Sequence, residues 1–164
     1  MRRVRRSREA CALIALGIAT ASALPAHAGS RQDATVLLSE DPEDRKFQED
    51  IGYADAVVAG DTIYLSGVVA GLRNENDTLE AAYVRVFEGI GAILKRAGAS
   101  WDDVVEMTSF HTDLTNQLPT LVAVKKRYVK APPPAWTAIG VSRLLPNRGL
   151  TEIKVIAKLP SKKR

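Results

Sequence analysis

The sequence is poor in the residues that most often serve as nucleophiles and metal ligands. Its 164 residues include one cysteine, Cys11, and two histidines, His27 and His111. A single cysteine cannot form a disulfide within the chain, and the neighbours of His111 offer no spacing typical of a metal site. The glycines form no phosphate-binding loop after a predicted strand. We therefore expect neither a metal nor an organic cofactor.

Long hydrophobic runs are also missing. The longest apolar stretch, residues 11–24, is shorter than the roughly 20 residues that a membrane-spanning helix needs. Arginines precede it, and the small-x-small triplet Ala-His-Ala follows at 26–28, a pattern typical of a cleaved signal peptide. We predict a signal peptide over residues 1–28 and export to the periplasm or the medium, by the Sec or the twin-arginine route. An N-terminal anchor and a misassigned start codon are the alternatives.

Outside the predicted signal peptide, the chain has no excess of positive charge. The whole sequence carries 23 basic and 19 acidic side chains, of which residues 1–28 hold five and one, leaving 18 of each. Proteins that bind nucleic acid use a basic surface to neutralise phosphates. We therefore expect no nucleic-acid partner, and no membrane partner once the signal peptide is removed.

Four segments follow from composition. After the signal peptide, residues 29–50 are polar and acid-rich, which predicts a flexible polar arm. Residues 51–160 are long enough for one folded domain. Residues 161–164 form a short basic tail.

The first half of the domain has the pattern of two strands and a helix. Residues 53–59 and 62–69 are rich in strand formers and flank a two-residue turn at 60–61, which predicts a tight hairpin. A helix with one apolar face follows, with Asp77 or Thr78 as its N-cap.

The second half repeats this plan and adds two strands. We predict a strand at 104–112, a helix at 118–129, and strands at 136–141 and 150–159. Apolar residues alternate along the last strand, so one face of the sheet can pack against both helices. The predicted fold is α+β with the order ββαβαββ.

Two signatures in the domain resemble those of the RidA/YjgF family. Near the C-terminus the matching residues are Pro134, Ala135, Thr137, Ile139, Val141, Glu152, Ile153, Ile156 and Ala157. Upstream, the matching residues are Tyr53, Gly60, Asp61, Ser66, Gly67, Ala97, Gly98, the run at 101–105, Asp113 and Leu114. The resemblance implies a chorismate-mutase-like fold, with two helices on one face of a mixed sheet. It also implies a homotrimeric barrel that holds small molecules in clefts between subunits.

The resemblance fails at one important position. Family enzymes have an arginine where this chain has Trp136. The resemblance implies that this arginine binds the substrate carboxylate. A guanidinium offers a fork of donors, whereas an indole has one N–H and no charge. Trp136 then shapes a pocket for an apolar ligand, faces a cation, or fills the cleft. The family asparagine is also replaced, by Leu121 or Val122.

The resemblance assigns roles to four further residues. Glu152 aligns with the glutamate that orients or activates the hydrolytic water, although it could instead pair with a nearby cation such as Lys154 or Arg148. Tyr53, Ser66 and Thr137, together with Trp136, align with substrate-binding positions. No metal ligand is implied.

The sequence leaves two possible functions. One is an enamine or imine deaminase, which hydrolyses C=N bonds of compounds like 2-iminobutanoate and 2-iminopropanoate to a keto product and ammonia. Its substrate preference would be altered by Trp136. The other is a non-catalytic trimeric protein that binds a small molecule. Endoribonuclease activity is attributed to some family members, but the neutral charge gives it little support.

Overall fold

The structure is a computed structural model that describes residues 33–160. The predicted signal peptide and the basic tail lie outside the described residues. Within 33–160, none of the helices combines the length and the apolar character needed to cross a membrane. The strands are β1 (Thr35–Leu37), β2 (Ala56–Ala59), β3 (Thr62–Leu65), β4 (Val68–Ala70), β5 (Val104–His111), β6 (Ala135–Gly140) and β7 (Thr151–Lys158). The helices are α1 (Pro42–Ile51), α2 (Leu79–Arg96) and α3 (Leu114–Tyr128).

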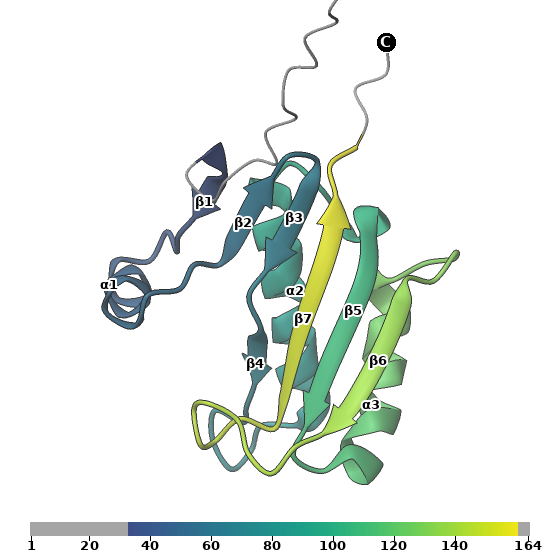
Figure 1. The fold of residues 1–164 in the computed structure, drawn as a ribbon. Coiled ribbons are helices and arrows are strands. Elements are labelled where there is room, and N and C mark those ends of the chain that lie inside the picture. The colour runs from purple at the N-terminus through teal and green to yellow at the C-terminus, as the bar shows by residue number, and fades with distance from the viewer. Residues whose placement is uncertain (1–32, 161–164) are drawn as a thin grey trace, which may run out of the picture.

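The strands form one mixed sheet with α2 and α3 against the same face (Figure 1). The strand order is β1-β2-β3-β7-β5-β6, and β4 also pairs with β7. Only the β5–β6 pair is parallel, because the α3 crossover joins these two strands. The predicted α+β class is confirmed, and from β2 onward so is the predicted ββαβαββ order, with its second strand divided into β3 and β4. We call the face away from α2 and α3 the open face.

Alternation along β7 produces the core. Ile153, Val155 and Ala157 are at most 1% exposed and lie under the helices, while Glu152 and Lys154 lie on the open face. This confirms the predicted two-sided character of the last strand. From α2, the side chains of Phe87, Ile90 and Leu94 complete the same core.

The prediction of a flexible arm is wrong for its described part. β1 pairs with β2, and α1 occupies Pro42–Ile51. The Asp41 side chain caps α1 by accepting from two backbone N–H groups, and Gly52 ends the helix at φ 84. Inside it, Gln48 is buried and binds the Asp55 side chain at 2.6 Å. The cap at Asp41 and the hydrogen bond between Gln48 and Asp55 stabilise α1 in spite of its acidic composition.

The predicted strand at 62–69 is interrupted. β3 and β4 both pair with β7, but the register shifts by one residue between them, at Ser66-Gly67. Beyond such a bulge, each side chain points to the opposite face of the sheet from the one that strict alternation would give. After it, Val69 pairs with Glu152 on the open face. The bulge therefore brings the backbone of Gly67 close to the Glu152 side chain.

Helix α3 starts earlier than predicted. Asp113 caps it by accepting from the backbone N–H of Asn116, so the helix begins at Leu114. Pro119 therefore lies inside the helix and not in its first turn. The proline had suggested a later start because proline is common at the first helical position.

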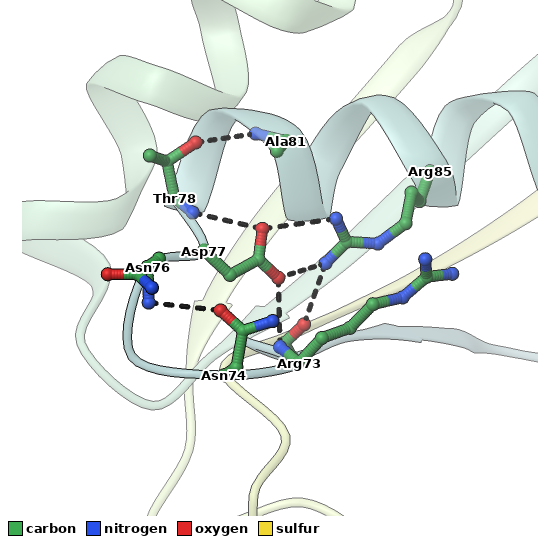
Figure 2. A network of polar contacts seen from close by, with 8 residues as sticks. Arg73, Asn74, Asn76, Asp77, Thr78, Ala81 and Arg85 are labelled. Carbon is green, nitrogen blue, oxygen red and sulfur yellow. Dashed lines mark hydrogen bonds and ion pairs between the residues drawn. The ribbon is translucent and has the colours of Figure 1, made fainter.

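A polar network ties the loop after β4 to α2 (Figure 2). The carboxylate of Asp77 accepts from Nη1 and Nη2 of Arg85 at 3.2 and 2.5 Å, and from the backbone N–H of Arg73. The Arg85 guanidinium and these backbone donors lower the pKa of Asp77 to about 2. Thr78, the next residue, caps α2 by accepting from Ala81. Of the two predicted caps, Thr78 is the one observed.

Candidate functional site

Glu152 lies on the open face of β7 with its carboxylate against the bulge. A Cβ atom added to Gly67 would sit 1.7 Å from Glu152 Oε1, so only glycine leaves room for this carboxylate. Burial raises the pKa of Glu152, and Lys154 opposes this shift. Among residues 33–160 no hydrogen bond or salt bridge engages the Glu152 side chain, so the predicted alternative of a pair with Lys154 is not observed.

A hollow of about 740 Å³ opens beside Glu152. The bulge, β4 and the segment before β2 line one side of it, α1 lines another, and Ile93 of α2 and the loop between β6 and β7 contribute further side chains. The lining residues that matter for chemistry are Tyr53, Ser66, Gly67, Asp44, Asp55 and Glu152. Helix α1 adds the apolar side chain of Phe47, which the predicted flexible arm did not anticipate.

Tyr53 presents its hydroxyl as a proton donor. Its ring meets Phe47 edge to face, with 6.1 Å between centroids and 79° between planes. Burial, followed by the nearby charges of Asp55 and Asp44, raises the pKa of Tyr53. The phenol therefore stays protonated at neutral pH and can donate a hydrogen bond to a ligand.

Ser66 lines the hollow, but its proton is used in the fold. Ser66 Oγ donates to the Ala54 carbonyl at 2.6 Å, and its backbone N–H donates to the Asp55 carbonyl at 2.9 Å. These two bonds fasten the bulge to the segment before β2. Toward a ligand, the Ser66 hydroxyl is left to act as an acceptor.

The hollow has acidic side chains and no basic ones among the described residues that line it. Asp55 is neutralised by Arg96, at 2.8 Å. Asp44 and Glu152 have no such ion-pair partner within residues 33–160. The hollow therefore offers a carboxylate and hydroxyl groups, but no basic side chain among the described residues that line it.

Trp136 lies on the other face of the sheet. It pairs with Met107 of β5, a fully buried residue beneath the helices. Its indole Nε1 donates to Ser109 Oγ at 3.0 Å. Lys125 of α3 sits over the ring, with Nζ 3.8 Å from the centroid. Of the three predicted uses of Trp136, facing a cation is the one that this geometry displays.

Thr137 shares the open face with Glu152 but lies on β6. Strand β5 separates β6 from β7, so two strand spacings of about 4.8 Å each lie between the two side chains. Within one subunit the structure thus brings Tyr53, Ser66 and Glu152 together. It leaves Trp136 and Thr137 apart from them.

No group of three histidine, cysteine or acidic side chains within residues 33–160 could hold a metal ion. His111 is fully buried and hydrogen-bonded to Ser109 and Thr151. Burial lowers the pKa of His111, which keeps the imidazole neutral.

Comparison with known proteins agrees with this geometry. The family described as Endoribonuclease L-PSP matches residues 45–159, which include both sides of the site. The chain belongs to this family. Among curated relatives, RutC family protein YjgH of Escherichia coli is 41% identical over 114 residues, covering 66% of this chain and 83% of the relative. The 2-iminobutanoate/2-iminopropanoate deaminase of Dermatophagoides farinae is 30% identical over 109 residues, covering 63% and 83%.

Solved structures of family members have the same fold. Protein YJGH superimposes with a TM-score of 0.65 at 32% identity, covering 78% of this chain and 98% of its own. RidA from the Antarctic bacterium Psychrobacter sp. PAMC 21119 gives a TM-score of 0.58 at 34% identity, covering 65% and 87%. The resemblance to the RidA/YjgF family is confirmed.

Proposed function

We propose that this protein hydrolyses reactive imines to a carbonyl compound and ammonia, with Glu152 as the group that activates water. The main supporting observation is the Glu152 carboxylate, which is half-buried against Gly67 and forms no salt bridge or hydrogen bond among the described residues. A general base works best when its pKa lies near the working pH, and burial shifts Glu152 in that direction. A relative that is named as an imine deaminase supports this choice of reaction.

The reaction needs one proton to leave water and return to nitrogen. A water molecule held by Glu152 attacks the carbon of the protonated C=N bond, and its proton passes to the carboxylate. This forms a carbinolamine, whose nitrogen then takes the proton from Glu152. The C–N bond breaks, ammonia leaves, and the hydroxyl proton is released as the C=O bond forms. In this proposal Tyr53, which lines the same hollow, donates a hydrogen bond to the reacting groups.

We propose further that the site is completed in a homotrimer, with the ligand in clefts between subunits. The open face supports assembly, because Tyr64 and Ile139 are 45% and 40% exposed there. The separation of Trp136 from Glu152 within one chain supports it as well. An intersubunit cleft would join the two sides that a single subunit keeps apart. Export through residues 1–28 remains part of the proposal.

The test is an assay of 2-iminopropanoate decay with the purified protein. We expect wild type to accelerate hydrolysis and Glu152→Gln to reduce the rate by about 100-fold or more, since general base catalysis contributes 10²–10⁴. Glu106→Gln is the matched control, because Glu106 is an exposed carboxylate of β5 that does not line the hollow. Equal rates for wild type and Glu152→Gln would contradict the proposal. Ligand binding without any hydrolysis would favour the alternative of a non-catalytic binding protein.

A further inference from the structure

The indole of Trp136 is held by a directed chain of buried hydrogen bonds. An indole N–H can only donate, so Ser109 Oγ accepts from it at 3.0 Å. The Ser109 hydroxyl then donates to His111 Nε2 at 2.9 Å, which leaves the imidazole proton on Nδ1, facing Thr151 Oγ1 at 3.3 Å. Thr151 in turn donates to Gln117 Oε1 at 3.1 Å. Ser109, His111 and Thr151 are fully buried, so the indole edge is firmly anchored.

The ammonium group of Lys125 lies over the Trp136 ring and has no ion-pair partner among residues 33–160. Lys125 Nζ lies 3.8 Å from the Trp136 ring centroid, and no residue within 33–160 forms a hydrogen bond or salt bridge with this ammonium. The Lys125 side chain is half-buried, and burial, followed by the charge of Lys126, lowers the pKa of Lys125. A partly desolvated ammonium without an anion is a favourable place for one to bind.

The position of Lys125 is set by the same helix face that supports the core. Leu121 precedes it by one turn, is fully buried, and is one of the two residues, with Val122, that the resemblance puts where family members have an asparagine. Arg143 and Arg148 are exposed in the loop before β7 and do not line the hollow. Lys125 is thus the cation that stands beside the residue replacing the family arginine.

We propose that Lys125, held on the face of Trp136, binds the carboxylate of the ligand. This inference rests on the proposed function and assigns the residue that binds the carboxylate of its substrate. The ammonium supplies a point charge instead of the guanidinium fork, and the indole supplies an apolar wall for the carbon chain. In the proposed trimer, Lys125 of one subunit would supply the positive charge that the acidic hollow of the next subunit lacks.

The experiment compares two ligands across three variants of the full chain. Titration calorimetry measures binding of 2-oxobutanoate and of 2-butanone, which lacks the carboxylate, to wild type, Lys125→Met and Lys126→Met. We expect Lys125→Met to weaken 2-oxobutanoate binding by about tenfold or more. Lys126→Met, the neighbouring exposed lysine, should change it by less than about twofold. Neither variant should alter the response to 2-butanone, and Lys125→Arg should restore 2-oxobutanoate binding.

Three results would overturn the inference: no binding of 2-oxobutanoate to wild type, equal affinity in wild type and Lys125→Met, or equal losses in Lys125→Met and Lys126→Met. Thermal unfolding of each variant shows that a loss of binding is not a loss of fold. The imine assay separates the two proposals. If hydrolysis depends on Glu152 but binding of 2-oxobutanoate does not depend on Lys125, only the inference is contradicted. If binding depends on Lys125 but no hydrolysis is seen, only the proposed activity is contradicted.

Discussion

The two faces of the sheet differ in the charged side chains that they present. On the open face, Glu152 lies in a hollow with hydroxyl groups and acidic side chains, and no basic residue of the described chain lines it. On the helix-covered face, Lys125 lies on Trp136 with no ion-pair partner among residues 33–160. The hollow has a carboxylate without a basic lining residue among the described residues, and the helix-covered face has a cation without an ion-pair partner. In the proposed trimer, neither half alone would complete a site for a ligand with a carboxylate.

The largest expected effect comes from closing the space around Glu152. In Gly67→Ala the new Cβ would lie 1.7 Å from Oε1, so the carboxylate must leave its position. We expect imine hydrolysis to fall by about 100-fold or more. Gly89→Ala is the matched control, because a Cβ there meets nothing within 4 Å on α2. That variant should keep full activity and gain about 0.5–1 kcal/mol of unfolding free energy. Full activity in Gly67→Ala would contradict the assignment of Glu152.

A second prediction concerns a variant in which the cation on the helix-covered face is at position 136 instead of position 125. Trp136→Arg in the Lys125→Met background again has one cation at this place, now with a fork of donors. We expect 2-oxobutanoate affinity to recover by about tenfold relative to Lys125→Met alone, as measured by calorimetry. If affinity does not recover, the Trp136 position does not face the ligand.

A third prediction separates the ring of Trp136 from its N–H. Trp136→Phe keeps an aromatic face for Lys125 but removes the donor to Ser109. We expect the free energy of unfolding in urea to fall by about 1 kcal/mol. Binding of 2-oxobutanoate should change by less than the loss seen for Lys125→Met. A larger loss of binding than of stability would show that the N–H itself contacts the ligand.

A fourth prediction concerns pH on the open face. The folded pKa of Glu152 lies above its ordinary value, so ionised Glu152 opposes folding once the pH rises above that folded pKa. Glu152→Gln should therefore be slightly more stable than wild type at pH 7, with the difference shrinking as the pH falls through the folded pKa. Urea unfolding at several pH values measures this. A variant that is less stable at pH 7 would mean that the carboxylate is stabilised by a partner.

We expect the smallest effect on activity for a substitution of Asp77, whose carboxylate already forms an ion pair with Arg85. The folded pKa of Asp77 is about 2 because Arg85 and two backbone donors bind its carboxylate. Its contribution to stability is present above the unfolded pKa and is lost as the pH falls toward 2. Asp77→Asn should therefore be less stable than wild type at pH 7, and this difference should shrink as the pH falls and vanish only below about pH 2. Imine hydrolysis should not change at neutral pH.

Much of the fold could be predicted because its signals are local. The alternation in β7 and the cap at Thr78 follow from neighbouring residues alone. Helix α1 was missed because an acidic composition outweighed Asp41 and Gly52, which do mark a helix. The bulge at Ser66-Gly67 was missed because residues 62–69 have continuous strand propensity, and only the pairing with β7 breaks them.

The site was predicted only in part because its arrangement depends on strand order. The sequence motif identified Glu152 and Trp136, but not that β5 lies between their strands. Lys125 had a signal in its spacing of four residues from Leu121, which puts both on one helix face. That signal was hidden because a lysine in the last turn of a helix is usually solvated and needs no further function.

The most direct test mixes two impaired variants. Glu152→Gln lacks the base and Lys125→Met lacks the cation, so each homotrimer should hydrolyse 2-iminopropanoate poorly at low substrate concentration. If the two half-sites come from different subunits, trimers reassembled from both variants contain clefts with an intact Glu152 and an intact Lys125. The account predicts that the mixture is more active than the sum of its separate components. Activity equal to that sum after verified subunit exchange would contradict it.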